Sequence, residues 1–125
     1  FKEYNDTYGH PAGDECLQQV ARAISYAVRQ SDLVSRYGGE EFAVILPNTN
    51  SEAAFQIAAR ISKMVKSLQI AHENSNVSNY VTISCGVATT IPNCQSSLND
   101  LIIRADKALY EAKRQGRDRV NIAII

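Results

Sequence analysis

The chain has 125 residues, which fits a single domain large enough to bury a hydrophobic core. Thirteen basic residues balance thirteen acidic ones, so the formal net charge is zero. This balance argues against a broad surface for nucleic acid or anionic lipid, although it permits a local phosphate site. No apolar run reaches the ~18 residues of a membrane-spanning helix. We therefore expect the domain to contact neither a membrane nor nucleic acid.

The three cysteines are Cys16, Cys85 and Cys94, and none belongs to a CxxC pair. Their odd number and spacing favour neither a disulfide framework nor a zinc cluster. We expect each thiol to act as small apolar filler in a reducing, cytoplasmic setting. The sequence begins at Phe1 without a methionine, which is typical of a piece of a longer protein.

The first predicted element is a helix over residues 13–30, because its apolar residues recur at helical spacing. The residues of this stripe are Leu17, Val20, Ala21, Ile24 and Ala27. Asp14 near the start of the helix suits the positive end of the helix dipole.

Two strands are predicted next, over residues 33–37 and 41–47, with Gly38 and Gly39 between them. Glycine tolerates the positive φ angles that tight hairpin turns require, so we expect the strands to form a hairpin. The apolar run AVIL, residues 43–46, is typical of a central strand that is covered on both faces.

The rest of the chain alternates between helices and strands. The predicted ranges are 51–69 (helix), 71–79 (polar loop), 80–89 (strand), 97–116 (helix ending at Gly116) and 119–125 (strand). Ser51 is the expected cap of the first of these helices. Its expected buried stripe is Phe55, Ala58, Ile61, Val65 and Leu68. The order of elements predicts an α+β fold, an α/β sandwich with helices covering a mostly antiparallel sheet.

The stretch RYGGEEF, residues 36–42, places two glycines directly before two carboxylates. Glycines remove side chains, so a ligand can approach the backbone closely. Carboxylates at Glu40 and Glu41 are hard oxygen ligands suited to Mg²⁺, which favours sites shared with substrate phosphates. The alternative, on spacing alone, is an ordinary hairpin with solvated glutamates.

Three separated motifs occur in order along the chain: FKEYNDTYGHPAGD at 1–14, RYGGEEF at 36–42 and YEAKRQGR at 110–117. Together they resemble the GGDEF family of diguanylate cyclases, here in the GGEEF form, over residues 1–120. The resemblance implies a palm-like, ferredoxin-like central sheet with flanking helices, similar to nucleotide cyclases and some polymerases. It also implies that two GTP molecules are joined into cyclic di-GMP, with release of two pyrophosphates, by a homodimer that carries one GTP on each subunit.

The resemblance assigns roles to the residues of the turn. Glu40 and Glu41 match acids that bind Mg²⁺ (or Mn²⁺) and carry catalysis, and Glu40 is expected to help deprotonate the ribose 3′-hydroxyl that attacks the opposite α-phosphate. Gly38 and Gly39 match substrate-binding positions, where they let the turn pass close to the nucleotide.

Asn5 and Asp14 match the residues that read guanine. The chemistry is sensible because a carboxylate can accept hydrogen bonds from guanine N1–H and N2–H₂, a geometry that adenine does not offer. His10 matches a substrate-contacting position. The alternatives are a turn residue for Asn5, a helix-start acid for Asp14 and a structural role for His10.

Lys113 and Arg117 match phosphate-binding positions. They lie four residues apart across the end of the last helix and could therefore face the same way. The alternative is that they are helix-end cations favoured by the helix dipole. Leu109 and Tyr110 are interpreted as packing residues at the core or its rim.

Arg29 and Asp32 form an RxxD pair five residues before the two glycines, which resembles the inhibitory product site of the family. An arginine fork suits phosphate and guanine acceptors, and Asp32 can take guanine donors. RxxD is frequent by chance, and its position before the hairpin is what favours this interpretation. We predict that cyclic di-GMP binds here and inhibits the enzyme.

The family begins this domain with a strand that carries a DxD-type motif, whose first Asp is a main metal ligand, just before the phenylalanine that matches Phe1. That strand is not among residues 1–125, so either the parent protein has it or the domain truly lacks it. We expect the first, an N-terminally truncated GGDEF domain, and a parent protein with an upstream sensor or regulatory domain. The parent is expected to be cytoplasmic or membrane-anchored. Whether residues 1–125 are active or dimeric by themselves stays open.

Two other functions compete with the enzyme. A catalytically inactive module that senses GTP or cyclic di-GMP is the first, and the intact GGEEF stretch at residues 38–42 favours the enzyme over it. An unrelated ferredoxin-like nucleic-acid binder is the second. It is disfavoured because the chain lacks the basic surface and exposed aromatic pairs expected of such proteins.

Overall fold

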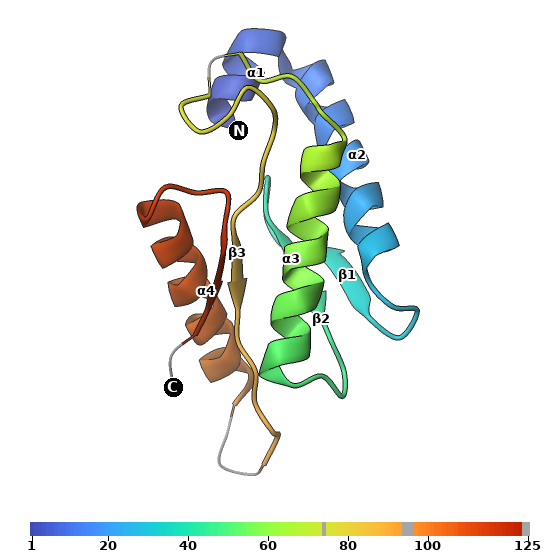
Figure 1. Cartoon of the computed structure of the whole chain (residues 1–125), viewed down its shortest axis with the longest axis vertical. Helices are drawn as coiled ribbons and strands as arrows, with labels where there is room; N and C mark the ends of the chain where they lie inside the picture. Colours follow the sequence, from blue (N-terminus) through green and yellow to red (C-terminus); the bar gives the residue numbers. More distant parts are fainter. Residues whose placement is uncertain (74, 94–96, 124–125) are drawn as a thin grey trace.

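The computed structural model describes residues 1–73, 75–93 and 97–123 (Figure 1). The elements are α1 (Lys2–Tyr8), α2 (His10–Ala27), β1 (Leu33–Arg36), β2 (Phe42–Ile45), α3 (Ser51–Ser67), β3 (Cys85–Val87), α4 (Leu98–Arg114) and β4 (Val120–Ile122). Among the helices described, none is long and apolar enough to cross a membrane.

The strands form two pairs. β1 and β2 are an antiparallel hairpin that runs from Leu33↔Ile45 to Arg36↔Phe42, whereas β3 and β4 pair in parallel from Cys85↔Val120. Neither β2 nor β3 has a partner strand on its other edge within the described ranges. The α+β class is confirmed. The mostly antiparallel arrangement holds for the hairpin but not for β3 and β4, because α4 crosses over between them and returns the chain in the same direction.

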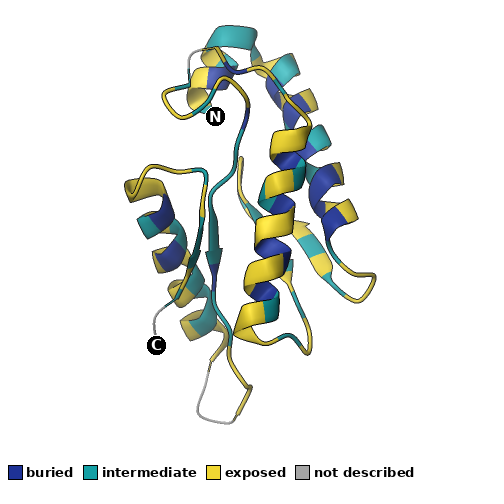
Figure 2. Cartoon of the chain, viewed as in Figure 1, coloured by how far each residue is buried: buried dark blue, intermediate teal, exposed yellow. Residues whose placement is uncertain are grey.

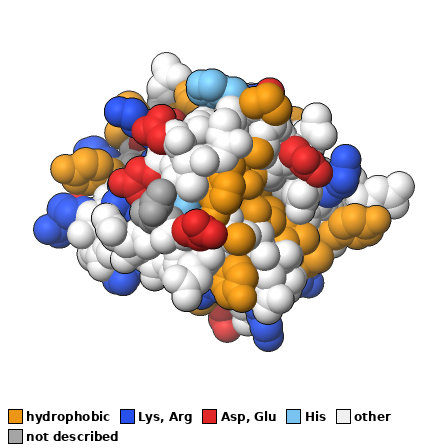
Figure 3. All heavy atoms as spheres, turned by 90° about the horizontal axis from the view of Figure 1, so that it is seen from above, with side chains coloured by type: hydrophobic (Ala, Val, Ile, Leu, Met, Phe, Trp, Pro, Cys, Tyr) orange, Lys and Arg blue, Asp and Glu red, His pale blue; other side chains and the backbone are white. Residues whose placement is uncertain are grey.

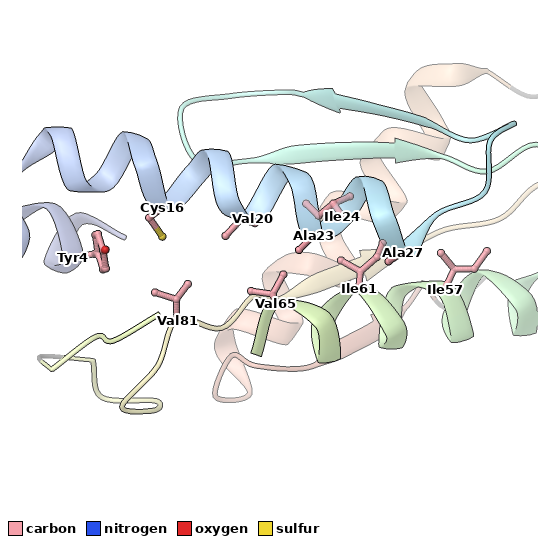
Figure 4. Packing of buried hydrophobic residues seen from close by; sticks show 10 residues of the cluster. All are labelled: Tyr4, Cys16, Val20, Ala23, Ile24, Ala27, Ile57, Ile61, Val65 and Val81. Carbon is pink, nitrogen blue, oxygen red and sulfur yellow. The ribbon is translucent and has the colours of Figure 1, made fainter. Parts of the chain in front are cut away.

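Helix α3 lies at the centre of the molecule, against α2 on one side and against β3 and β4 on the other (Figure 1). The larger core cluster joins α1, α2, α3 and the segment that precedes β3. Its labelled members are Tyr4, Cys16, Val20, Ala23, Ile24, Ala27, Ile57, Ile61, Val65 and Val81 (Figure 4). Burial follows the facing sides of α2 and α3, while the loops and the outer face of α4 are exposed (Figure 2).

Helix α3 is rotated relative to the predicted stripe. Phe55 and Leu68 are each 38% exposed, so their expected place in the core was wrong. The buried positions are Ala54, Ile57, Ala58, Ile61 and Val65, which also follow helical spacing. The cap was also misplaced, because the Asn50 side chain accepts the Ala53 N–H and Ser51 is already inside the helix.

The N-terminal region contains a helix that the apolar pattern did not predict. α1 is short and buries only Tyr4, and it ends at Gly9, whose φ of 89° turns the chain into α2. α2 therefore begins at His10, earlier than expected, and Asp14 lies beyond its first turn.

Strand β3 is shorter than predicted, because only Cys85–Val87 has a partner strand among the residues described. Helix α4 lies very close to this strand. A Cβ atom on Gly86 would come within 2.3 Å of the Ala105 carbonyl oxygen and 2.4 Å of the Leu109 nitrogen. Glycine is therefore required at this contact for steric reasons. At the other end of α4, Gly116 has a φ of 125°, as expected of a residue past a helix end.

Two of the cysteines behave as apolar filler. Cys16 is buried in the core, Cys85 is half-buried, and both thiols are free. Burial raises the pKa of Cys16, and it raises the pKa of Cys85 to about 11, so neither is a thiolate at neutral pH. Cys94 lies outside the described residues.

Candidate functional site

The segments that carry most of the predicted site residues are directed toward one end of the molecule. The hairpin turn, residues 37–41, points toward the end at which α1 and the start of α2 lie (Figures 1 and 4). The C-terminal end of α4 points the same way (Figure 1). Seen from this end, a band of hydrophobic side chains crosses the surface, with acidic and basic side chains on either side (Figure 3).

The hairpin turn is held by hydrogen bonds of its own backbone and of Arg36. The N–H groups of Tyr37 and Gly38 both donate to the Glu41 carbonyl oxygen, at 2.8 and 3.3 Å. The Arg36 guanidinium donates from Nε to the Gly38 carbonyl oxygen at 3.2 Å and from Nη2 to the Gly39 carbonyl oxygen. Sequence reasoning missed this role of Arg36. The available signal was an arginine directly before a turn whose carbonyl groups need donors.

The glycines of this turn are not explained by backbone conformation. Neither Gly38 nor Gly39 has a positive φ, so the expected reason for glycine was wrong. A Cβ on Gly39 would meet no atom within 4 Å, and one on Gly38 would meet only Glu41, at 3.8 Å. The space beside the turn is therefore open in this state, and a ligand could approach the backbone closely there.

Glu40 and Glu41 are exposed, and neither carboxylate is paired with a cation in the described part of the chain. Across the same residues, no three His, Cys, Asp or Glu side chains gather into a metal cluster. Two hard carboxylates fit Mg²⁺, which is commonly held by one or two carboxylates together with substrate phosphates and water. The two glutamates can thus supply part of a metal site and need further ligands to complete it.

Asn5 and Asp14 are brought together through Gly13. Asn5 lies within α1, and its Oδ1 is buried without a hydrogen-bond partner among the described residues. A Cβ on Gly13 would lie 1.8 Å from that oxygen, so the carboxamide rests against the backbone that directly precedes Asp14. The alternatives lose support because Asn5 is not in a turn and Asp14 is not in the first turn of α2.

His10 is the first residue of α2 and is exposed. It follows Gly9, at the junction where α1 ends and α2 begins. This places the imidazole at the same junction that holds Asn5 and Gly13, where a ligand can reach it from solvent.

Lys113 and Arg117 do not share a helical face. α4 ends at Arg114, and Arg117 has left the helix with a φ of 63°, its N–H donating to the Ala112 carbonyl oxygen at 2.9 Å. The four-residue spacing expected to align them therefore does not apply. Both side chains are exposed and unpaired within the described ranges, unlike Arg114, which pairs with Glu111 at 2.7 Å.

Arg29 and Asp32 lie together in a closed arrangement, which we call the Arg29–Asp32 clasp. Arg29 donates to the Asp32 carboxylate from Nε at 3.1 Å, from Nη2 at 2.9 Å and from its backbone N–H at 2.8 Å. Its Nη2 also reaches the Pro47 carbonyl oxygen at 3.3 Å and the Thr49 hydroxyl.

This clasp links the loop before β1 to the loop after β2. The Asp32 side chain is 0% exposed and that of Arg29 is 43% exposed. Hydrogen bonds from Arg29 lower the pKa of Asp32, so the acid is ionised at neutral pH. The acceptor oxygens of Asp32 are thus already engaged within the chain.

The two residues interpreted as packing differ from each other. Leu109 is half-buried against β3, as expected, but Tyr110 is 66% exposed and lies outside the core. Tyr110 lines a shallow groove of about 470 Å³ on the outer face of α4, together with Ile103, Asp106, Lys107 and Glu111. None of the predicted site residues lines this groove.

Comparison with known proteins identifies relatives over nearly the whole chain. A family model described as "Diguanylate cyclase, GGDEF domain" matches residues 1–119. The chain is 46% identical over 123 residues to Diguanylate cyclase A of Treponema denticola, covering 98% of this chain and 32% of that protein. It is 37% identical over 123 residues to diguanylate cyclase DgcP of Pseudomonas aeruginosa, covering 98% and 18%. The chain thus spans about a third or less of these curated relatives.

Solved structures give the same picture. The active GGEEF domain of a diguanylate cyclase from Vibrio cholerae superposes with a TM-score of 0.86 at 32% identity, over 99% of this chain and 76% of that one. The GGDEF domain of DgcB from Caulobacter crescentus, solved in complex with c-di-GMP, superposes with a TM-score of 0.84 at 35% identity. That match covers 97% of this chain and 70% of the other.

Proposed function

Because the chain belongs to the GGDEF family, we propose that it is the catalytic domain of a diguanylate cyclase that condenses two GTP molecules into cyclic di-GMP. The observation that carries the proposal is the GGEEF turn, whose two carboxylates are exposed beside open space and have no cationic partner among the described residues. Charge that is neither buried nor paired adds little to folding, whereas beside a phosphate it can hold a cation.

In the proposed reaction, the ribose 3′-oxygen of one GTP forms a bond to the α-phosphorus of the other, and the bond from that phosphorus to the β-phosphate oxygen breaks. The leaving group is pyrophosphate, and the second half-reaction closes the ring with release of a second pyrophosphate. Glu40 takes up the proton of the attacking hydroxyl. Lys113 and Arg117 bind phosphate oxygens and stabilise the charge of the leaving group.

Glu40 and Glu41 are the residues that would hold Mg²⁺ (or Mn²⁺). When bound, the metal neutralises phosphate charge and lowers the pKa of a coordinated hydroxyl. The open backbone at Gly38 and Gly39 gives the triphosphate access to these two carboxylates. Catalysis on this scheme is mainly positioning and charge neutralisation, as in other phosphoryl transfers.

Guanine is read at the junction of α1 and α2. The Asp14 carboxylate accepts hydrogen bonds from guanine N1–H and N2–H₂, a pair of donors that adenine does not present, and the Asn5 carboxamide contacts the same base. The contact of the Asn5 carboxamide with Gly13, which directly precedes Asp14, supports this role because it holds the two side chains at one junction. His10, exposed at the same junction, contacts the substrate.

The reaction requires two nucleotides, so a homodimer is proposed in which two hairpin turns face each other, one GTP on each subunit. An upstream sensor or regulatory domain in the parent protein would control how often two domains meet. We place the domain in the cytoplasm, whether the parent is soluble or anchored to a membrane.

Product inhibition is proposed at the Arg29–Asp32 clasp. The half-exposed Arg29 guanidinium offers donors to phosphate and to guanine acceptors. Asp32 can accept donors from guanine only when Arg29 releases it, because its oxygens are engaged by Arg29. Binding of cyclic di-GMP here is therefore expected to open the clasp and to disturb its contacts with Pro47 and Thr49.

The domain over residues 1–125 is proposed to gain one more strand in its parent protein. β2 and β3 each have an unpaired edge among the described strands, and such edges are normally paired or covered. A strand that pairs there and carries a carboxylate would also supply a ligand that Glu40 and Glu41 lack.

A catalytically inactive module that senses GTP or cyclic di-GMP is the second candidate. It is favoured by the lack of a cluster of three metal-binding side chains in the ranges described. The two candidates differ in turnover and not in nucleotide binding.

The test is to incubate the parent protein with GTP and Mg²⁺ and to quantify cyclic di-GMP by chromatography. The proposal predicts product at a specific activity that rises with protein concentration, since two subunits must meet. Glu52→Gln, a change at an exposed glutamate of α3, serves as the matched control for Glu40→Gln. Tight GTP binding without product, at concentrations high enough to dimerise, would support the sensor instead.

A further inference from the structure

We infer that Gly13 is a specificity-positioning residue, whose missing side chain creates the space in which the Asn5 carboxamide is held for guanine. The inference rests on the proposed function, because it takes guanine as the group that Asn5 contacts. It adds a residue that does not touch the base and acts through Asn5.

The steric relation between the two residues is direct. A Cβ on Gly13 would lie 1.8 Å from Asn5 Oδ1 and 3.0 Å from Asn5 Cγ, distances that non-bonded atoms do not adopt. The next nearest atom is Cζ of the Phe1 ring, at 3.4 Å. Both atoms in conflict belong to the end of a side chain, so an alanine at 13 is accommodated by displacing the carboxamide and not the backbone.

The backbone around Asn5 cannot move to relieve that conflict. The Asn5 N–H donates to the Phe1 carbonyl oxygen at 3.0 Å, and its own carbonyl oxygen accepts the Gly9 N–H at 2.8 Å. The Gly13 N–H in turn donates to the Gly9 carbonyl oxygen at 3.1 Å. Gly9 thus links the end of α1 to the start of α2 and fixes the separation of Asn5 and Gly13.

The core packing beside this contact is equally fixed. Tyr4, which precedes Asn5, is buried and points toward Cys16 of α2 (Figure 4). The Phe1 and Tyr4 rings stack, with centroids 5.9 Å apart. With α1 anchored to α2 on this side, the freedom that is left lies in the side-chain torsions of Asn5.

The contact between Gly13 and Asn5 combines two local features that each lower the stability of the fold. Gly13 lies inside a helix without a positive φ, where alanine would be more stable. Asn5 Oδ1 is buried without a partner in the described part of the chain. Folding explains neither feature. A role in fixing the carboxamide beside Asp14 explains both, because the contact of Oδ1 with Gly13 sets the orientation in which the carboxamide meets guanine.

The experiment compares Gly13→Ala, Asn5→Ala and the double variant in the parent protein with Mg²⁺. GTP, ITP (which lacks the 2-amino group) and ATP are the probes, and affinity is measured by calorimetric titration. We expect Gly13→Ala to weaken GTP binding about tenfold or more, to reduce the preference for GTP over ITP, and to leave ATP affinity unchanged. In the Asn5→Ala background, Gly13→Ala should change GTP affinity less than twofold, because the carboxamide it displaces is gone.

Thermal unfolding separates this role from a purely structural one. Gly13→Ala should leave the midpoint unchanged or raise it, since alanine favours the helix. If the single variant is instead less stable, the double variant should recover stability, because removal of the Asn5 carboxamide makes room for the added methyl group. A double variant as unstable as Gly13→Ala alone would overturn the inference.

The outcomes distinguish the inference from the proposed function. If Asn5→Ala weakens GTP binding but Gly13→Ala does not, or if the two losses add in the double variant, the role of Gly13 is overturned and the proposed function stands. If Asn5→Ala leaves GTP affinity unchanged, guanine reading by Asn5 is overturned, and the role of Gly13 with it.

Discussion

The hairpin turn and the Arg29–Asp32 clasp are charged segments attached to the same pair of strands, but their charges are in opposite states. In the clasp, the Asp32 side chain is 0% exposed and is bonded by Arg29 from three nitrogen atoms. In the turn, Glu40 and Glu41 are exposed and meet no cation within the described ranges. The Asp32 charge of the clasp is therefore paired within the folded chain, whereas the charges of the turn remain available to a ligand.

The role of a charged loop can be inferred from the hydrogen-bond partners of its carboxylates. A carboxylate whose hydrogen bonds are filled inside the chain joins segments, as Asp32 does by holding Arg29 beside Pro47 and Thr49. A carboxylate beside open backbone, as at Gly39, contributes little to stability and is available to a ligand. The turn is thus expected to govern activity and the clasp to govern stability together with product binding.

The largest expected effect comes from removing charge at the turn. Glu40→Gln should lower the rate of cyclic di-GMP formation about 100-fold or more, because the proton acceptor and a ligand of the charge-neutralising metal are lost. The unfolding free energy of this variant should stay within about 0.5 kcal/mol of the parent, since the side chain is exposed and no cation of the described residues pairs with it. Steady-state kinetics and denaturant titration check the two parts. Retained turnover would contradict the role of Glu40.

Gly86→Ala and Gly39→Ala compare a glycine packed tightly against its neighbours with a glycine beside open space. A Cβ at 86 meets backbone atoms of Ala105 and Leu109 at 2.3 and 2.4 Å, and overpacking of this kind costs about 1–3 kcal/mol. A Cβ at 39 meets nothing within 4 Å, so stability should change by less than about 0.5 kcal/mol while GTP affinity falls. Denaturant midpoints and GTP titrations check this. Equal destabilisation by both changes would contradict the claim that Gly39 lies beside open space.

Arg29→Ala tests the clasp. Product affinity should fall about tenfold, since a guanidinium that binds phosphate or guanine is lost. The unfolding temperature should also fall by a few degrees, because the covered Asp32 carboxylate loses its partner. Calorimetric titration with cyclic di-GMP and thermal unfolding measure the two effects. Arg22→Ala, at an exposed arginine of α2, is the matched control. Parental product affinity in Arg29→Ala would rule out the inhibitory site.

The smallest effect concerns a buried group that lacks a partner in the described structure. His72 packs edge-on against Tyr4, and its Nδ1 has no hydrogen-bond partner among the described residues. Burial lowers the pKa of His72 below its ordinary value of 6.5. The unfolded chain therefore binds the proton more readily, so the contribution to stability is present above pH 6.5 and is lost as the pH falls through the lowered pKa. His72→Phe should remove a drop of a few degrees in the unfolding temperature between pH 7.5 and 5.5. An unchanged drop would show that another group titrates.

Much of the fold was predictable because it follows from local patterns. α2, α4 and the hairpin match their predicted ranges to within a few residues, since apolar periodicity and glycine positions mark them. The phase of α3 was not predictable, because Ala54 and Phe55 both fit a helical stripe and the contacts of α3 decide between them. The short, polar α1 leaves only Tyr4 as a buried residue and gave no periodic signal.

For the candidate site, the sequence indicated residues but not their conformation or hydrogen bonding. Motif positions indicated Asn5, Asp14, Glu40 and Glu41. They could not show that the clasp is closed, or that Asn5 Oδ1 is buried without a partner among the described residues. These features depend on side-chain conformation and on how neighbouring elements pack, as do the steric demands at Gly13 and Gly86, and motif spacing does not specify either. Arg117 was misjudged for a related reason, because the chain leaves the helix before reaching it.

The most direct test of the central claim locates the bound cation. Mn²⁺ in place of Mg²⁺ broadens nearby amide resonances through its unpaired electrons, and isotope-labelled protein can be recorded with and without GTP. We expect GTP-dependent broadening to be strongest at residues 38–41 and the resonances of Arg29 and Asp32 to be spared. Broadening centred on the Arg29–Asp32 clasp, or none at the turn when GTP is bound, would contradict that claim.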